Sequence, residues 1–217
     1  MDLDRFVDKY RQLRVVEAAR FLVGHCLVRD HPELGEVRAL ITEAEAYRED
    51  DPASHSYHGR TARTWPMFER PGILYVYLSY GVHHCMNVSA EEEGRGAAVL
   101  IRRLVGLPPH QHLRMLGPGL ICRALAIDRS MNGLDLFDPA SPLRLMPNPE
   151  REKLAPYIQV GERIGIKVAV EKPWRFYINR ELEKALLTGG RQADLSLLES
   201  ARGQAGEAQG QGSQSGA

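Results

Sequence analysis

The chain has 217 residues and 43% of them are hydrophobic, which is enough to bury one sizeable core and favours a single domain. Its 28 Lys and Arg residues balance its 28 Asp and Glu residues, so the formal net charge is zero and a uniformly basic nucleic-acid-binding protein is excluded. No apolar run reaches the roughly 18–20 residues of a membrane helix, and the charged N-terminal segment lacks the pattern of a signal peptide, so we expect a cytoplasmic protein with no membrane partner.

The first half of the chain predicts a helix, a strand and a long loop. Apolar residues at helix-like spacing predict a helix over residues 1–28, which Gly24 can end. Alternation predicts a strand over residues 35–47, with one face made of Val37, Ala39, Ile41, Glu43, Glu45 and Tyr47. The polar stretch 48–72 predicts a loop with short helical pieces, and a loop of that length in a compact domain is usually functional.

Strands dominate the middle of the chain. The aromatic and β-branched run ILYVYLSY, residues 73–80, predicts the clearest strand. Further predicted elements are strands over 83–89 and 97–104, a helix over 120–127, and closing strands over 159–170 and 174–178.

The order of these elements shows no regular βαβ rhythm. It predicts an α+β fold, a single mixed domain with a largely antiparallel β-sheet surrounded by helices, over residues 1–199. Residues 200–217 are rich in Gly and Gln, which predicts a disordered tail.

Two carboxylates stand out as candidates for chemistry. Glu43 and Glu45 lie two residues apart on a predicted strand, so both can project from one face at the end of an apolar run. Partial desolvation there would raise the pKa of a carboxyl group and suit it to general-base catalysis. The alternative interpretation is a solvated strand end that carries two surface acids.

Tyrosines cluster around the same part of the sequence. Tyr47, Tyr75, Tyr77 and Tyr80 provide flat rings with polar tips, which is what a pocket needs to sandwich a nucleobase. They can also be read as tyrosines of the core or of an interface.

The sequence disfavours metal and covalent-lysine chemistry. His83 and His84 are adjacent on a predicted strand and point to opposite faces, so they cannot bind one ion together. Three cysteines without a C-x-x-C pair indicate neither a disulfide framework nor a zinc site. Residues 37–115 contain no lysine for a Schiff base. We therefore expect no metal, no cofactor and water as the nucleophile.

Charge is distributed unevenly along the chain. Residues 55–114 carry seven arginines against four glutamates, together with six of the eight histidines. This pattern predicts a local basic face on a neutral protein.

Several short motifs occur in a fixed order: E-A-Y, A-S-H, M-F-x-x-P-G-x-L-Y-V-Y, Y-G-x-x-x-C-M-N and V-L-I-R, followed by GPGLICRALAI, RIGI and RFY. In this order and at these separations, over roughly residues 15–180, they resemble the alkyladenine (3-methyladenine) DNA glycosylase family, the mammalian-type alkylpurine DNA N-glycosylases. The resemblance implies a mixed α/β domain with a curved antiparallel sheet.

The resemblance also implies an activity. It is that of a monofunctional enzyme of base excision repair, which binds damaged double-stranded DNA as a monomer and flips an alkylated or deaminated purine out of the duplex. The implied substrate class is 3-methyladenine, 7-methylguanine, hypoxanthine and ethenoadenine. An activated water then hydrolyses the N-glycosidic bond and leaves an abasic site.

The resemblance implies catalytic roles for three residues. Glu45, in E-A-Y, matches the general base that activates water. Arg102, in V-L-I-R, matches a group that orients the water, and the main-chain carbonyl of Ile164, in RIGI, matches a third contact.

The resemblance also implies that five more residues contact the damaged base or the duplex around it. Tyr47, His55 and Tyr77 match the walls that stack on the flipped base. Asn87, in C-M-N, matches the residue that would clash with the 2-amino group of unmodified guanine, and Tyr80 matches the wedge that enters the duplex.

Two other functions fit parts of the sequence. A glycoside hydrolase would use Glu43 and Glu45 as its acid and base, which must lie about 5–9.5 Å apart. A nonenzymatic nucleic-acid-binding β-module would use the tyrosines for stacking and release no base.

Overall fold

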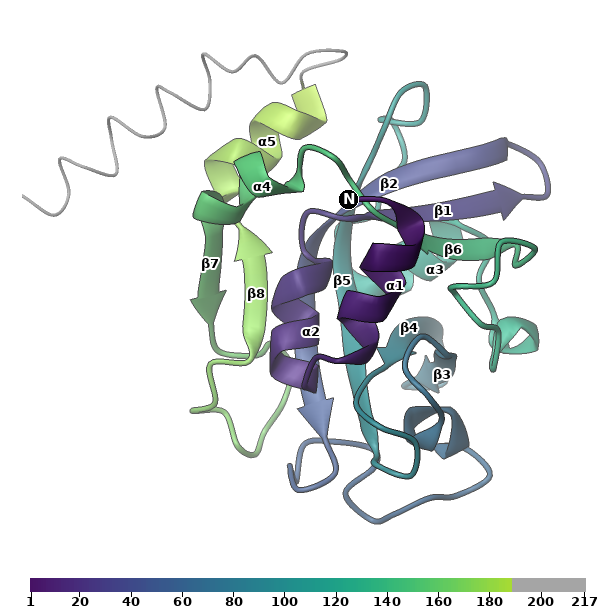
Figure 1. Cartoon of the computed structure of the whole chain (residues 1–217), viewed down its shortest axis with the longest axis vertical. Coiled ribbons are helices and arrows are strands. Elements are labelled where there is room, and N and C mark those ends of the chain that lie inside the picture. Colours follow the sequence, from purple (N-terminus) through teal and green to yellow (C-terminus); the bar gives the residue numbers. More distant parts are fainter. Residues whose placement is uncertain (189–217) are drawn as a thin grey trace, which may run out of the picture.

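A computed structural model of the chain describes residues 1–188 (Figure 1). Within this range, eight strands form one antiparallel sheet, in which the path β3-β4-β5-β2-β1-β6 is joined by β8 on β2 and by β7 on β8. The strands are β1 (Cys26–His31), β2 (Gly35–Arg48), β3 (Leu74–Ser79), β4 (His83–Ser89), β5 (Ala97–Gly106), β6 (Leu143–Met146), β7 (Ile158–Gly161) and β8 (Arg175–Ile178).

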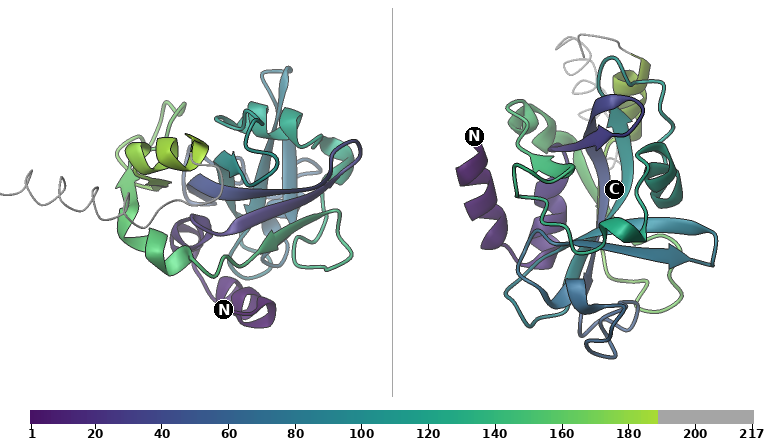
Figure 2. Two further views of the ribbon diagram at one scale, coloured as in Figure 1. Left: turned by 90° about the horizontal axis from the view of Figure 1, so that it is seen from above. Right: turned by 90° about the vertical axis from the view of Figure 1, so that its right-hand side faces the viewer.

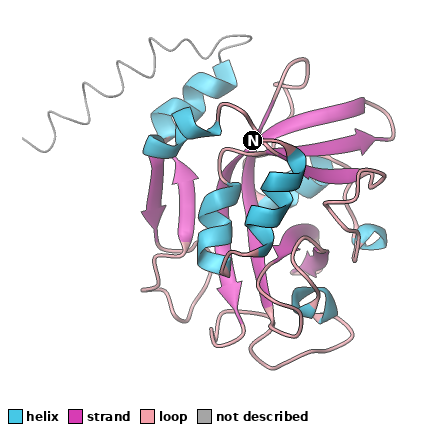
Figure 3. Ribbon diagram, in the orientation of Figure 1, coloured by secondary structure: helices cyan, strands magenta, loops and turns pink. Residues whose placement is uncertain are grey.

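Helices surround the strongly curled sheet (Figure 3). The two N-terminal helices lie in front of β2 and β5 in the view of Figure 1, and α2 contacts both strands. The α-helices in residues 1–188 are α1 (Leu3–Arg11), α2 (Val15–Leu22), α3 (Pro118–Ala124), α4 (Arg151–Leu154) and α5 (Arg180–Thr188). Across these residues, no helix combines the length and the apolar character needed to cross a bilayer.

The predicted α+β fold with a curved, largely antiparallel sheet is confirmed. The predicted strands over 73–80, 83–89 and 97–104 correspond to β3, β4 and β5, and the short helical turn Trp65–Phe68 lies in the predicted loop 48–72. The predicted domain end at residue 199 and the predicted tail 200–217 lie outside the described residues.

The predicted continuous helix over residues 1–28 is wrong. The chain forms α1, breaks, forms α2 and enters β1 at Cys26. The break is stabilised from a distance, because the buried Glu91 carboxylate accepts a 3.2 Å hydrogen bond from the Val15 amide at the start of α2. A negative charge at a helix N-terminus is favourable, so α2 begins where Glu91 meets it.

The predicted closing strands agree only in part. β8 matches the strand predicted over 174–178, but β7 ends at Gly161, so most of the strand predicted over 159–170 is a loop. The helix predicted over 120–127 forms two residues earlier, as α3. The patterns in the sequence did not predict β1, β6, α4 or α5.

Strand β2 is the centre of the sheet. One edge pairs with β5 along Ala39–Arg48, while the other pairs with β1 over its first half and with β8 at Glu43–Glu45. The register against β5 is irregular between Ile41 and Ala44.

This irregularity changes which side chains of β2 face the core. Val37, Ala39, Leu40 and Ile41 belong to the core before it, whereas Ala44 and Ala46 belong to the core after it. The prediction that Val37, Ala39, Ile41, Glu43, Glu45 and Tyr47 share one face is therefore wrong. An irregularity of this kind re-aims side chains, and here it directs Glu45 away from the apolar core.

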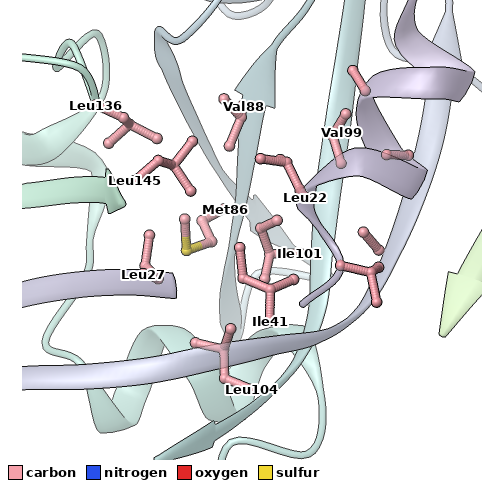
Figure 4. Close-up of a cluster of buried hydrophobic side chains, with 14 of the residues drawn as sticks. Leu22, Leu27, Ile41, Met86, Val88, Val99, Ile101, Leu104, Leu136 and Leu145 are labelled. Atoms are coloured by element: carbon pink, nitrogen blue, oxygen red, sulfur yellow. The ribbon is translucent and has the colours of Figure 1, made fainter. Parts of the chain in front are cut away.

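The core itself lies between the sheet and the helices. Figure 4 shows Leu22 of α2 close to Val99 and Ile101 of β5, with Ile41 of β2 and Met86 of β4 nearby. These side chains are almost wholly removed from water. Each contributes roughly 1.5–3 kcal/mol by burial, which anchors the strands that carry the site described below.

We expect the Phe137 ring to make any larger residue at position 72, just before β3, destabilising. Gly72 has φ of 102°, and an added Cβ would lie 2.4 Å from the Phe137 ring. Gly72→Ala should lower the free energy of unfolding by the cost of a positive φ plus about 1–3 kcal/mol of overpacking. Chemical denaturation of purified variants measures this.

Gly35→Ala is the matched control for this prediction. Gly35 also has a positive φ, 72°, but an added Cβ there meets no heavy atom within 4 Å. Equal losses of stability in the two variants would contradict a steric role for Phe137.

Candidate active site

A pocket of about 640 Å³ opens on the sheet beside the β3–β4 hairpin. This volume is in the range of about 300–1,000 Å³ that is typical of small-molecule sites. Seven of the eight residues singled out by the sequence motifs line it, namely Tyr47, His55, Tyr77, Tyr80, Asn87, Arg102 and Ile164. The structure thus gathers residues that are more than 100 positions apart into one cavity.

The eighth residue, Glu45, lies behind this lining and is 0% exposed. Its Oε1 accepts a 2.7 Å hydrogen bond from the main-chain amide of Ile164. Its Oε2 accepts hydrogen bonds from the Tyr47 hydroxyl (2.8 Å) and from Nη1 of Arg102 (3.1 Å). Arg102 also donates to the carbonyl oxygen of Ile164 at 3.2 Å, so the four residues form one connected cluster.

Burial raises the pKa of Glu45 above the ordinary carboxyl value. The positive charge of Arg102 and the hydrogen bonds from Ile164 and Tyr47 act in the opposite direction, but they do not cancel the desolvation. A carboxylate in this state binds a proton more readily than a surface acid, which is the property that a general base requires.

Aromatic side chains form another part of the pocket wall. The His55 and Tyr77 rings meet edge to face with centroids 4.5 Å apart, and Nδ1 of His55 lies 3.0 Å from the buried Tyr75 hydroxyl. Desolvation and the nearby Arg63 charge lower the pKa of His55 to about 4. His55 is therefore a neutral, flat ring at neutral pH.

Asn87 lines the pocket from β4, which lies between β3 and β5. Its side-chain amide donates a 3.1 Å hydrogen bond to the Tyr75 carbonyl, and it pairs across the sheet with Tyr75 on β3 and Leu100 on β5. The side chain is buried, so its position is set by the sheet.

Tyr80 lies at the tip of the β3–β4 hairpin and is 94% exposed. In the right-hand view of Figure 2 the hairpin extends from the body on the side away from α1. Tyr80 and Gly81 both adopt positive φ angles, 49° and 69°, which make the tight turn that projects the Tyr80 ring into solvent.

Glu43 lies outside the pocket lining, in a cluster of arginines. It is 1% exposed and forms ion pairs with Arg175 (3.2 Å), Arg180 (2.6 Å) and Arg102 (3.6 Å). The interpretation of Glu43 and Glu45 as solvated surface acids is therefore wrong. Since Arg102 contacts both carboxylates, Glu43 helps to hold the guanidinium that contacts Glu45.

A further buried ion pair, which the sequence did not indicate, lies beside the Tyr47 ring. Arg163 and Asp51 are fully buried and in direct contact, and the Arg163 guanidinium lies 4.7 Å from the centroid of the Tyr47 ring. Its other ring neighbour is Trp174, at 5.2 Å. These partners are far apart in the sequence, so no local pattern indicates the pair.

Arg63 is a further lining residue that carried no assigned role. It extends from the loop between β2 and β3, and its guanidinium lies 5.6 Å from the centroid of the Tyr77 ring. The only signal in the sequence was its membership of the arginine-rich stretch 55–114.

Metal-binding and thiol chemistry gain no support from the described residues. Residues 1–188 contain no group of three or more His, Cys, Asp or Glu side chains arranged to hold an ion. Cys26, Cys85 and Cys122 are free, and burial raises the pKa of each thiol.

Comparison with known proteins identifies the family. The sequence profile described as methylpurine-DNA glycosylase matches residues 8–182. A relative from Synechococcus sp. (strain JA-3-3Ab) is 43% identical over 170 residues, which cover 72% of this chain and 87% of that protein. A relative from Granulibacter bethesdensis is 43% identical over 190 residues, covering 82% and 85%. Both relatives are named for 3-methyladenine DNA glycosylase activity.

We expect the Arg163–Asp51 pair to be essential for the stability of the wall that carries Tyr47. Arg163→Met should lower the free energy of unfolding by about 3–5 kcal/mol, because it leaves the Asp51 charge buried without its main partner. The exposed pair Arg38–Glu36 provides the control, and Arg38→Met should cost less than about 1 kcal/mol. Denaturant titration of both variants makes the comparison, and similar losses would argue against a special role for Arg163.

Proposed function

The chain belongs to the methylpurine-DNA glycosylase family, and from this premise we propose that it flips a damaged purine out of duplex DNA and hydrolyses the N-glycosidic bond with an activated water. As a DNA repair glycosylase it is a hydrolase of N-glycosyl bonds. The nonenzymatic β-module and the carboxylate-pair glycoside hydrolase do not agree with this membership. The proposed substrates are the alkylated and deaminated purines that the motif resemblance implies.

The observation that carries the proposal is the cluster of Glu45, Tyr47, Arg102 and Ile164 beneath the pocket. An ionised carboxylate offers about four acceptor sites on its two oxygens. Glu45 uses two on Oε2 and one on Oε1. We assign the remaining site, on Oε1, to the attacking water, which reaches it only when the lining residues move, because Glu45 is 0% exposed.

In the proposed reaction, this water attacks C1′ of the flipped nucleotide. Its proton passes to Glu45, and the electron pair of the C1′–N9 bond leaves with the purine. The sugar develops positive charge in the transition state, which the Glu45 carboxylate stabilises. Arg102 and the carbonyl of Ile164 orient the water. The pocket lining in the described part of the chain contains no lysine, which favours water over a Schiff base.

We assign the aromatic wall to base binding. Unstacking a nucleotide costs a few kcal/mol, and stacking in the pocket offsets this cost. Tyr47, His55 and Tyr77 supply the stacking surfaces, and the exposed Tyr80 fills the gap left in the duplex. Asn87, fixed by its bond to Tyr75, clashes with the 2-amino group of normal guanine.

As the motif resemblance implies, we propose that the enzyme acts as a monomer on damaged double-stranded DNA and needs no cofactor. The cytoplasmic location expected from the sequence stays a prediction.

The central test is Glu45→Gln. This variant keeps the shape of the side chain but cannot accept the proton of water, so the single-turnover rate of base release should fall by about 100-fold to 10,000-fold. Affinity for a duplex with a damaged purine should be retained, as measured by fluorescence anisotropy. The exposed Glu33→Gln variant should release base at the normal rate. Normal turnover by Glu45→Gln would remove Glu45 from the mechanism.

The pH profile gives an independent test. Because the general base must be ionised, the rate should rise with pH through a midpoint above 4.5, the ordinary value for a carboxyl group. Arg102→Gln removes a charge that lowers the pKa of Glu45, so the midpoint should move to higher pH even though the maximal rate also falls. If the midpoint in Arg102→Gln is the same as in the wild type, the ionisation that limits the rate at low pH does not belong to Glu45.

The raised pKa of Glu45 also affects the free energy of unfolding. Rising pH increases the rate but decreases this contribution to stability. The folded state binds the Glu45 proton more tightly than the unfolded chain does. The stabilisation of the folded state by this tighter proton binding is therefore present below pH 4.5, and it is lost as the pH rises through the raised pKa of Glu45. The enzyme is active in the charged state that is less favourable for folding.

A further inference from the structure

Arg63 places a positive charge directly against the proposed base-binding wall. Its Nη2 lies 3.2 Å from Nε2 of His55, and its guanidinium carbon lies 5.6 Å from the centroid of the Tyr77 ring. The side chain is exposed and lines the pocket. A purine stacked on His55 or Tyr77 would therefore lie next to this guanidinium.

The charge of Arg63 is not balanced by a carboxylate, in contrast to that of Arg102. Arg102 contacts Glu45 at 3.1 Å and Glu43 at 3.6 Å. Arg63 forms no ion pair with any carboxylate of residues 1–188, and its contacts include the rings of His55 and Tyr77 and the side chain of Tyr75. The lining residues in the described chain include two arginines and no Asp or Glu. His55 adds no charge at neutral pH.

Damaged purines differ in the charge with which they leave. When the C1′–N9 bond breaks, its electron pair stays on the purine. A neutral base such as hypoxanthine then carries a developing negative charge until it takes up a proton from solvent. A cationic base such as 7-methylguanine becomes neutral. A fixed positive charge beside the base stabilises the first transition state and repels the second substrate.

Arg63 also has the right donors for a neutral purine. A guanidinium presents several N–H groups in a planar fork. The purine edge of a base with an oxo group carries acceptors at N7 and O6, which arginine commonly binds. Stronger bonds to these atoms as the base becomes anionic would lower the barrier to its departure.

We propose that Arg63 is a specificity-determining residue that makes the pocket favour neutral damaged purines over cationic methylated ones. This inference rests on the proposed function, because it requires the base to enter the pocket lined by His55 and Tyr77. It adds a donor for the leaving base that the motif resemblance does not identify.

The test compares two substrates within one variant. Single-turnover base release is measured on matched duplexes that contain either hypoxanthine or 7-methylguanine. Arg63→Met should reduce the rate ratio of hypoxanthine to 7-methylguanine by about 10-fold to 100-fold. Most of the change should come from slower release of hypoxanthine. Arg63→Lys keeps the charge and should retain part of the preference.

Arg60→Met is the matched control. Arg60 belongs to the same loop, is exposed and pairs with Glu69 at 2.8 Å, but it does not line the pocket. It should leave the rate ratio unchanged. An equal loss on both substrates in Arg63→Met would make Arg63 a contact for the DNA backbone and overturn the inference. The inference would also be overturned if the rate ratio of hypoxanthine to 7-methylguanine fell as far in Arg63→Lys as in Arg63→Met.

These outcomes separate the inference from the proposed function. If the wild-type protein releases none of the proposed damaged purines, 3-methyladenine included, the proposed function fails. If it releases methylated purines but no hypoxanthine, the inference about Arg63 fails. If it releases both and Glu45→Gln releases neither, the proposed function stands, and the rate ratio in Arg63→Met alone decides the role of Arg63.

Discussion

The burial of one carboxylate, that of Glu45, is the interaction on which the rest of the site depends. An ionised carboxylate that leaves water costs several kcal/mol unless donors in the protein replace its hydration. Its three donors come from Tyr47 on the same strand, from Arg102 on β5 and from Ile164 in the segment that follows β7. Strands β2 and β5 and this segment must therefore all be in place before Glu45 can be both buried and charged. The geometry of Glu45 is coupled in this way to two distant parts of the chain, β5 and the segment after β7.

The irregular register of β2 makes that burial compatible with an apolar core. A strand with strict alternation would place Glu45 on the face of Val37 and Ile41, which pack against the helices. The shift between Ile41 and Ala44 moves Ala44 and Ala46 into the core and leaves Glu45 facing the pocket side. At the same position β2 exchanges β1 for β8 as its neighbour. One local irregularity thus bends the sheet and separates the chemistry from the hydrophobic packing.

The sequence predicted features that are encoded locally and missed those that depend on distant partners. Alternation and β-branched residues were sufficient for β3, β4 and β5, whereas the start of α2 depends on Glu91, 76 residues away. The motif resemblance named seven residues that line one pocket, because each lies in a short recognisable pattern. Arg163 and Asp51 are 112 residues apart and belong to no such pattern. The pairing of β8 with β2 and of β7 with β8 brings their two segments together, and alternation alone does not describe it.

The two guanidinium groups of the pocket differ in their partners. Arg102 pairs with Glu45 at 3.1 Å, and it shares the Glu43 carboxylate with Arg175 and Arg180. In the proposed reaction, bond breaking makes the sugar positive and makes a neutral base negative. Arg63 is uncompensated by described carboxylates and lies against His55 and Tyr77, where the base would stack. A chain with zero net charge can therefore present a guanidinium without a carboxylate partner to the proposed base-binding wall, because among the described residues it pairs Arg102 with Glu45 and leaves Arg63 without such a partner.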